Sequence, residues 1–205
     1  MIGILDLGIC NLKSIYNAIY NLGYEVKIIN EKNFGDIKLV SKIILPGVGS
    51  YSQISKRYFN YPELVNEVNN YFKKGNYFLG ICLGMQFLSS EGHENGLSKG
   101  LGFIPGVVKK FENNSNFKIP HVGWNEINIL KKDQNIFFDI MNNTNFYFVH
   151  SYYFNLDNYD FVLAETNYGV KFPAVIRKEN TFGFQFHPEK SSKKGLMLLN
   201  NFCAI

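Results

Sequence analysis

One stretch near the middle of the chain constrains the fold more than any other. The apolar run Tyr77-Phe78-Leu79 leads directly into Gly80-Ile81-Cys82-Leu83-Gly84-Met85-Gln86. Glycines two before and two after a nucleophile are typical of a sharp strand-to-helix turn, because the neighbours of a strained residue cannot carry a clashing Cβ. We expect Cys82 to stand exposed at the end of a strand, where the first turn of the next helix favours the thiolate. A buried structural cysteine beside an ordinary glycine turn is the alternative.

The composition is typical of a globular protein. Hydrophobic residues make up 46% of the 205 residues and charged residues 19%, which is enough apolar material for one sizeable core. We therefore expect a single domain over residues 1–205. No apolar run approaches the ~20 residues that a membrane span needs. The first six residues have no basic region and no cleavage site, so we expect a cytoplasmic protein that does not contact membranes.

Cysteine content and charge argue against several classes of function. The three cysteines, Cys10, Cys82 and Cys203, are far apart and lack Cys-x-x-Cys spacing, which argues against a disulfide framework and a zinc site. The four histidines are isolated from one another in the sequence, so we expect neither a metal nor a cofactor. The formal net charge is only +4 and the lysines are scattered, so nucleic-acid binding is not favoured.

Short apolar segments alternate with helical patterns through the first half of the chain. Strands are expected at 2–5, 26–29, 43–45 and 77–79, and helices at 12–22 and 64–72. This alternation is typical of βαβ units and of a parallel sheet covered by helices on both faces.

The second half of the chain has a different texture. Short strands separated by turns are expected at 107–108, 124–129, 146–149, 161–165, 174–177 and 182–186, with a last helix at 192–202. We predict an α/β fold with a mixed, largely parallel central sheet flanked by helices, to which the second half adds antiparallel strands.

A base for the cysteine is predicted where the last strand ends, at His187-Pro188-Glu189. In an extended segment, residues two apart point to the same side, so Glu189 can pair with His187, fix its tautomer and stabilise the imidazolium. Pro188 restricts His187 to extended conformations. Sites of open α/β sheets lie at the carboxyl ends of the strands, where Cys82 and His187 would meet. A solvent-facing turn is the alternative for the tripeptide taken alone.

Donors for a developing oxyanion follow from the same geometry. One is the backbone N–H of Leu83, the residue after the nucleophile, and a second is expected from a neighbouring loop. Pro46-Gly47-Val48-Gly49 is the candidate, because its two glycines allow close approach to a substrate and reorientation of a peptide unit. The loop lacks the Lys-Ser/Thr that a phosphate-binding loop requires.

Five segments together resemble the class I (triad) glutamine amidotransferases in order and spacing. They are Leu45-Pro46-Gly47-Val48-Gly49, the Gly80 to Gln86 heptapeptide, Pro120-His121-Val122-Gly123-Trp124-Asn125, Tyr147-Phe148-Val149-His150-Ser151-Tyr152 and the stretch from Gly183 to Ser191. The third and fourth segments more particularly resemble the glutaminase subunit of imidazole glycerol phosphate synthase. The resemblance runs from Met1 to the last helix, and it implies a flavodoxin-like arrangement.

The resemblance implies hydrolysis of L-glutamine to glutamate and ammonia through a γ-glutamyl thioester on Cys82. His187 would act as base and then as acid, and Glu189 would orient it. The oxyanion hole would map to Val48, Gly49 and Leu83, with a peptide flip at Gly47-Val48. Glutamine-binding groups would map to Gly49, Gln86, His150, Ser151 and Tyr152.

The resemblance also implies a partner. In this family the ammonia passes into a (β/α)8-barrel synthase/cyclase subunit, which forms a heterodimer with the glutaminase and makes imidazole glycerol phosphate and an aminoimidazole carboxamide nucleotide in histidine biosynthesis. Positions near the partner face or the ammonia route would be Asn11, Trp124, Asn125 and Lys190. Each has a plainer alternative: Trp124 could be a core or rim residue, Lys190 a solvated charge, and His121 and His150 hydrogen-bonded structural residues.

One departure from the family pattern concerns the partner. The family usually has Gly before the Asn of its first loop, whereas Cys10 precedes Asn11 here. The rival is therefore a paralogous subunit that supplies ammonia for amidation of a nucleotide-activated sugar in surface polysaccharide synthesis. Two further alternatives are a catalytically silent glutamine-binding subunit and a cysteine hydrolase with its own substrate.

Overall fold

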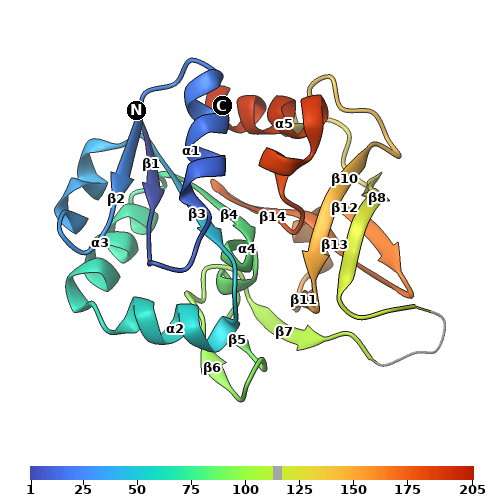
Figure 1. Ribbon diagram of the computed structural model, residues 1–205, viewed down its shortest axis with the longest axis horizontal. Coiled ribbons are helices and arrows are strands. Elements are labelled where there is room, and N and C mark those ends of the chain that lie inside the picture. The colour runs from blue at the N-terminus through green and yellow to red at the C-terminus, as the bar shows by residue number, and fades with distance from the viewer. Residues whose placement is uncertain (113–116) are drawn as a thin grey trace.

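An eight-stranded mixed sheet forms the centre of the computed structural model, which describes residues 1–112 and 117–205 (Figure 1). The strand order is β2-β1-β3-β4-β14-β13-β12-β9. The strands are β1 (Ile2–Leu5), β2 (Val26–Ile29), β3 (Lys42–Gly47), β4 (Tyr77–Cys82), β9 (Asn128–Ile129), β12 (Val162–Tyr168), β13 (Val170–Lys178) and β14 (Thr181–Phe184).

The first five strands in that order run parallel. β1 pairs with both β2 and β3, β3 pairs with β4, and β4 pairs with β14. This order is that of flavodoxin-like sheets, which bind ligands at the carboxyl ends of their strands. The predicted α/β class is confirmed, and Cys82 closes β4 while His187 follows β14, so both residues lie at this edge.

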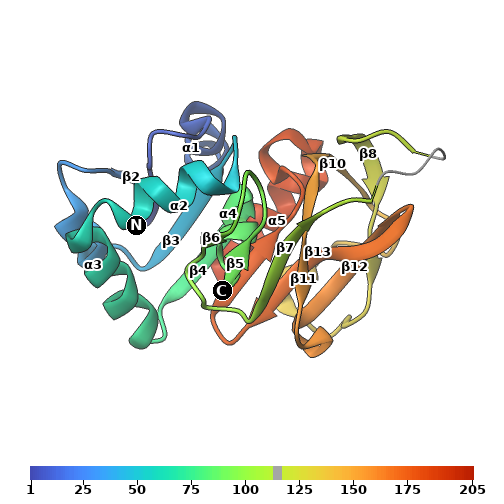
Figure 2. The same ribbon diagram turned by 90° about the horizontal axis from the view of Figure 1, so that it is seen from below.

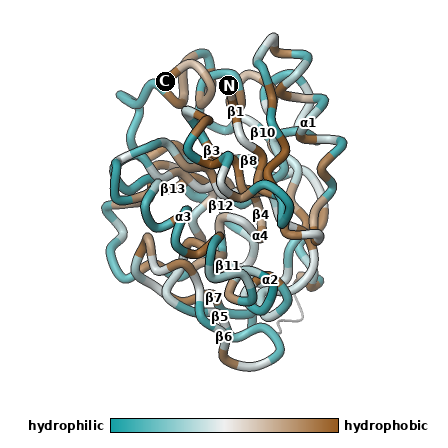
Figure 3. Tube along the Cα trace, turned by 90° about the vertical axis from the view of Figure 1, so that its left-hand side faces the viewer, coloured by the Kyte–Doolittle hydropathy of each residue, from teal (hydrophilic) through white to brown (hydrophobic). Residues whose placement is uncertain are grey.

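Helices cover both faces of the sheet. They are α1 (Leu12–Asn21), α2 (Tyr51–Phe59), α3 (Pro62–Lys73), the short α4 (Leu83–Phe87) and α5 (Ser192–Ala204). Ile44 of β3 belongs to the core beneath α1 and α5, whereas its neighbours Ile43 and Leu45 belong to the core beneath α2 and α3. This alternation is expected of a strand that is buried on both sides, and hydrophobic residues accordingly gather along the strands (Figure 3).

The second half does not simply extend the central sheet. β12, β13 and β9 join it in antiparallel pairing, but the remaining strands form two smaller sheets (Figure 2). One pairs β8 (His121–Glu126) with β10 (Asn145–His150). The other has the order β11-β7-β5-β6, with β5 (Glu91–Gly92), β6 (Ser98–Lys99), β7 (Gly106–Lys110) and β11 (Tyr152–Leu156).

The division between these sheets falls at Ser151. β10 ends at His150 and pairs with β8, whereas β11 begins at Tyr152 and pairs with β7. The chain changes partner sheet within a single residue, which brings the 150–152 segment to the edge where Cys82 lies. The expected strand at 182–186 also ends earlier, at Phe184, and Gln185–His187 leave the strand.

Helix α2 is missing from the sequence-based expectations. Its buried residues Tyr51, Ile54 and Tyr58 recur at helical spacing, and the side chain of Gln53 accepts a hydrogen bond from the Ser50 backbone N–H at 3.3 Å. A Ser-x-x-Gln pattern before apolar residues marks the start of a helix. Within residues 1–112 and 117–205, no helix is long and apolar enough to cross a membrane.

Candidate active site

The turn at Cys82 has the geometry of a nucleophile elbow. Cys82 has φ +54° and ψ −110°, a conformation that non-glycine residues rarely adopt and that tends to occur at functional sites. The flanking glycines are required sterically. A Cβ on Gly80 would collide with the backbone of Gly84, and a Cβ on Gly84 would collide with the carbonyl oxygen of Leu45 in β3.

Cys82 opens onto a cavity of about 390 Å³ at the carboxyl edge of the sheet. The side chain is not exposed as the sequence predicted, because only 6% of the residue is accessible. The small sheets of the second half fold over the strand end and leave the sulfur facing this cavity, with Cys82 Sγ 3.8 Å from the Val149 carbonyl oxygen of β10. The lining residues are Val48, Gly49, Cys82, Leu83, Gln86, Glu94, Pro120, Val149, His150, Ser151, Tyr152, His187 and Lys190.

His187 and Glu189 form a buried pair beside Cys82. Their Nδ1 and Oε1 atoms are 2.9 Å apart, and the two side chains are 5% and 7% exposed. The pairing does not use an extended segment, because Glu189 lies in a 3-10 turn, Pro188–Lys190. The turn places the Glu189 carboxylate within hydrogen-bond distance of His187 Nδ1. The hydroxyl of Ser191 donates to the His187 carbonyl at 2.6 Å and holds the turn in place.

The charge environment favours a protonated imidazole. Burial disfavours the charged form of His187, but the neighbouring Cys82 sulfur and the Glu189 carboxylate outweigh it and raise the pKa of His187 to about 10. Its Nε2 atom is buried and has no hydrogen-bond partner in the described part of the chain. A buried polar atom without a partner is costly. Because His187 lines the cavity, a reacting group bound there can supply the partner that Nε2 lacks.

The two expected sources of oxyanion donors meet at the elbow. Leu83 is the first residue of α4, and Gly47 packs so closely against it that an added Cβ would lie 2.9 Å from Leu83 Cβ. Gly49 has φ +99° and lines the cavity. The Val48 N–H, however, donates to the Ile9 carbonyl at 3.0 Å. The Val48 N–H is therefore already used in a hydrogen bond to the first loop of the chain.

The expected substrate-binding residues line one wall of the cavity. Gln86 Nε2 donates to the Tyr152 carbonyl at 2.7 Å, and His150, Ser151 and Tyr152 pass alongside it. Both ring nitrogens of His150 are already bonded, Nδ1 to the Tyr152 carbonyl and Nε2 to His121. His150 therefore contributes its backbone and ring edge to the wall, and its ring nitrogens are not free for a ligand.

Two residues at the site are missing from the sequence-based expectations. Gln185 is fully buried, accepts from Gln86 at 3.1 Å and places its Nε2 4.0 Å from the Cys82 sulfur. Glu94 lines the cavity and accepts from the Tyr51 backbone N–H at 2.7 Å. Burial raises the pKa of the Glu94 carboxyl. Gln185 lies two residues before His187, whereas no local pattern marks Glu94.

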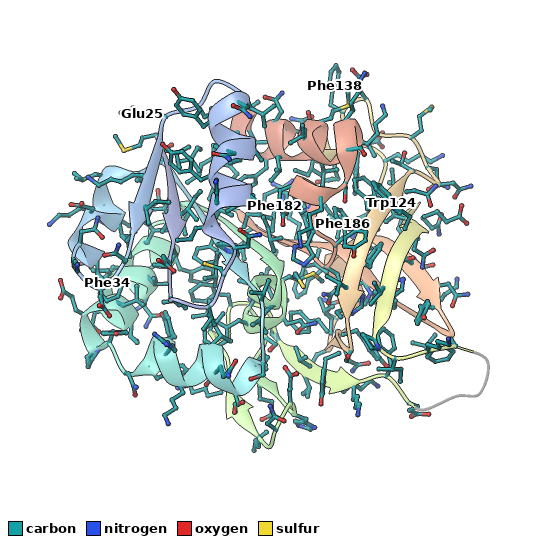
Figure 4. All side chains as sticks on the ribbon, viewed as in Figure 1. Glu25, Phe34, Trp124, Phe138, Phe182 and Phe186 are labelled. Carbon is teal, nitrogen blue, oxygen red and sulfur yellow. The ribbon has the colours of Figure 1, made fainter. Side chains whose placement is uncertain are left out.

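Of the four residues expected near a partner, one lines the cavity and the other three do not. Lys190 lines the cavity, and Asn11 precedes α1 in the first loop. Trp124 lies on β8 (Figure 4) and is 54% exposed, and its ring centroid lies 6.1 Å from that of Tyr147 on β10. Asn125 donates to His121 and to the Asn167 carbonyl.

The unusual Cys10 lies in the loop that holds Val48. Its sulfur is 3.5 Å from Asp6 Oδ1, and burial together with Asp6 raises the pKa of Cys10 to about 12. A raised pKa disfavours the thiolate, which is the nucleophilic form of a cysteine. Among residues 1–112 and 117–205, no group of three or more histidine, cysteine, aspartate or glutamate side chains could hold a metal ion. A cysteine, a buried imidazole and an orienting carboxylate at one cavity are the groups needed for acyl transfer.

Comparison with known proteins identifies the family. The model of the family "Glutamine amidotransferase class-I" matches residues 3–205. Subunit HisH 1 of imidazole glycerol phosphate synthase from Campylobacter jejuni strain 81-176 is 44% identical over 207 residues, which cover 100% of both chains. Subunit HisH of the same synthase from Methanocaldococcus jannaschii is 45% identical and is aligned over 98% of each chain.

Solved structures share the fold at lower identity. A crystal structure of a glutamine amidotransferase superposes with a TM-score of 0.75 at 20% identity, covering 99% of this chain and 97% of the other. The PurLQS structure from Thermotoga maritima superposes with a TM-score of 0.74 at 17% identity and the same coverage. The fold and the family model define a class-I glutamine amidotransferase. Within that class, the chain belongs to the HisH subunits of imidazole glycerol phosphate synthase.

Proposed function

We propose that this chain hydrolyses L-glutamine through a thioester on Cys82. The sulfur attacks the side-chain amide carbon, His187 gives its proton to the departing nitrogen, and ammonia leaves. Water then attacks the thioester with His187 as base, which releases glutamate and restores the thiolate. Glu189 holds the imidazole through Nδ1 and stabilises its charged form. The observation that carries this proposal is that Cys82 and the buried His187–Glu189 pair meet at one cavity.

The oxyanion hole is proposed to be incomplete in the isolated chain. The Leu83 N–H supplies one donor, and Gly49 allows the loop to approach the substrate. The second donor is the Val48 N–H, which is bonded to Ile9. Removal of one such donor costs roughly 10²–10³ in rate. We expect little glutaminase activity until the Gly47-Val48 peptide turns towards the cavity.

Glutamine is proposed to lie along the wall formed by Gln86, Ser151 and Tyr152, with Gly49 opposite and the backbone of His150 at its side. An amino acid also carries an ammonium group, which requires an acceptor. Glu94 is a partly buried carboxylate at the same cavity, and we assign it to that ammonium group. Glu94→Gln should then raise KM for glutamine while leaving Cys82 alkylation by iodoacetamide unchanged.

The ammonia is proposed to enter a (β/α)8-barrel synthase/cyclase subunit that docks at the mouth of the cavity as a heterodimer. Asn11, Trp124, Asn125 and Lys190 would lie at that face or along the ammonia route. The similarity to HisH subunits of imidazole glycerol phosphate synthase favours imidazole glycerol phosphate synthesis, and hence histidine biosynthesis, over amidation of a nucleotide-activated sugar. A single domain over residues 1–205 and a cytoplasmic location stay predictions.

The nitrogen source provides the decisive test. The chain is mixed with its synthase partner, and product is measured with either glutamine or an ammonium salt as nitrogen donor. Cys82→Ala should abolish glutamine-dependent synthesis and leave ammonium-dependent synthesis unchanged. Cys203→Ala, which alters a buried cysteine in α5, is the matched control and should retain both. Loss of both activities in Cys82→Ala would mean that Cys82 supports the fold or the interface.

The acceptor is tested by adding the phosphoribulosyl nucleotide of histidine synthesis to the same mixture. Strong stimulation of glutamate release is expected. Absence of stimulation, with Cys82 still alkylated by a glutamine-mimicking electrophile, would move the acceptor to a nucleotide sugar. Absence of alkylation would indicate a silent binding subunit. Turnover of esters or peptides without a partner would indicate a cysteine hydrolase.

A further inference from the structure

Two buried histidines connect the outer strand β8 with the wall of the cavity. His121 and His150 lie opposite each other in the pairing of β8 with β10, and they are 2% and 7% exposed. His121 Nδ1 and His150 Nε2 are 3.1 Å apart. The mechanism proposed above uses neither imidazole as an acid or a base, so their pairing calls for a separate explanation.

The outer end of this pair has a defined direction. The side-chain Oδ1 of Asn125 accepts from the Glu126 backbone N–H at 2.9 Å, and Asn125 Nδ2 donates to the Asn167 backbone carbonyl at 3.0 Å. The side-chain amide therefore has one orientation, with its second N–H facing His121 Nε2 at 3.4 Å. His121 Nε2 must accept, so the proton of the neutral ring lies on Nδ1.

The inner end requires the same direction. His150 Nδ1 lies 2.8 Å from the Tyr152 carbonyl oxygen, which can only accept. The proton of His150 therefore lies on Nδ1, and its Nε2 accepts from His121. Burial lowers the pKa of His121 to about 4 and that of His150 to about 3, so both rings are neutral. Both ends therefore require the same direction of donation: Asn125 donates to His121, His121 donates to His150, and His150 donates to the Tyr152 carbonyl.

This series of hydrogen bonds ends at the Tyr152 carbonyl, which also accepts from Gln86 in the wall of the proposed glutamine pocket. The Tyr152 carbonyl oxygen accepts one hydrogen bond from His150 Nδ1–H at 2.8 Å and another from Gln86 Nε2–H at 2.7 Å, which uses both of its lone pairs. The other N–H of Gln86 reaches Gln185 at 3.1 Å. The hydrogen bond that His121 donates to His150 thus helps to hold the Tyr152 peptide, where β10 passes into β11.

We infer that His121 is a positioning residue: its Nδ1–H donates to His150 Nε2 and holds the His150 ring, and thereby the Tyr152 peptide, in the wall of the glutamine pocket. This inference rests on the proposed function, because the wall matters only if glutamine binds there. Without the His121 donor, His150 Nε2 is a buried acceptor with no partner, which is costly and favours rotation of the ring out of this position. The Tyr152 carbonyl would then lose one of its two donors.

A crossed pair of variants separates hydrogen bonding from packing. The His121 ring also stacks on Tyr168 and Phe148, with centroid distances of 4.0 and 4.9 Å. His121→Phe keeps a stacking ring and removes the donor. His121→Asn removes the ring and keeps an amide N–H at the place of Nδ1. If His121 acts only by packing, His121→Asn should impair glutamine binding more than His121→Phe does. If His121 positions His150, His121→Phe should impair glutamine binding more.

The kinetic measurement uses the complex with the synthase partner. For His121→Phe, we expect KM for glutamine to rise about tenfold with kcat little changed, the size of effect that follows from one lost buried hydrogen bond. His121→Asn should stay within about twofold of the wild type. Ammonium-dependent synthesis should be unchanged in both variants, which reports on folding and docking. A larger KM in the Asn variant than in the Phe variant would overturn the inference.

A spectroscopic measurement tests the tautomer without any activity. In ¹⁵N-histidine-labelled protein, correlation spectra should show His121 and His150 protonated on Nδ1 and bare on Nε2. The ¹⁵N chemical shift of the bare His150 Nε2 should stay close to the wild-type value in His121→Asn and change in His121→Phe, where this nitrogen loses its donor. A His150 tautomer that is protonated on Nε2 in the wild type, or an Nε2 chemical shift that is unchanged in the Phe variant, would overturn the inference. If the wild-type complex did not hydrolyse glutamine, the proposed function would fail, whereas the hydrogen bond from His121 to His150 would still be decided by these spectra.

Discussion

Acid is expected to destabilise this protein through the same two histidines. Burial lowers the pKa of His121 to about 4 and that of His150 to about 3, whereas both return to roughly 6.5 in the unfolded chain. Between these values the unfolded chain binds more protons than the folded chain. The free energy of unfolding therefore falls as the pH drops from about 6.5 towards 4.

The size of the effect follows from the shifts. At pH 5, protonation stabilises each unfolded histidine by about 2 kcal/mol, while the folded rings stay largely neutral. The pair should thus lower the free energy of unfolding by about 4 kcal/mol between pH 7.5 and pH 5. That loss is a large part of the 5–15 kcal/mol typical of a globular domain.

The assay compares urea unfolding of the wild type and of His121→Asn at pH 7.5 and pH 5. Because the variant lacks one of the two histidines, it should lose about 2 kcal/mol less than the wild type over this interval. Other titrating groups are common to both proteins and cancel in the difference. His93→Asn is the control for removal of a histidine outside the buried pair, since His93 is a half-exposed side chain. Equal losses in wild type and His121→Asn would refute the reasoning.

Three further changes test the site and its frame. Glu189→Gln removes the charge beside His187 and should lower kcat for glutamine by roughly 10²–10⁴; unchanged glutamine kinetics in the partner complex would contradict the triad. Tyr58→Phe removes a buried hydroxyl that has no partner in the described chain, so urea unfolding should show unchanged or slightly raised stability, and a loss above about 1 kcal/mol would reveal a missed partner. Gly84→Ala drives a methyl group into the Leu45 carbonyl and should cost several kcal/mol or prevent folding; a variant that melts like the wild type would show that the elbow can relax.

The local patterns of the sequence predict the elbow and the base because each has a local physical cause. Gly80 and Gly84 are required where a strand turns sharply into a helix, and their collisions are confirmed in the structure. The strand-and-helix alternation likewise predicts the parallel half of the sheet, because strands buried on both faces are apolar throughout. His187 and Glu189 are close in sequence, so their pairing could be predicted, although the 3-10 turn that achieves it could not.

Long-range pairing decided the rest of the site. The change of sheet at Ser151 depends on what β8 and β7 offer as partners, and this change covers Cys82 and buries a thiol that the sequence predicted to be exposed. His121 and His150 meet only because β8 pairs with β10, and the Val48 N–H meets Ile9 only because two loops lie side by side. A local pattern carries the chemistry of a residue, whereas the direction of its hydrogen bonds depends on segments far away along the chain.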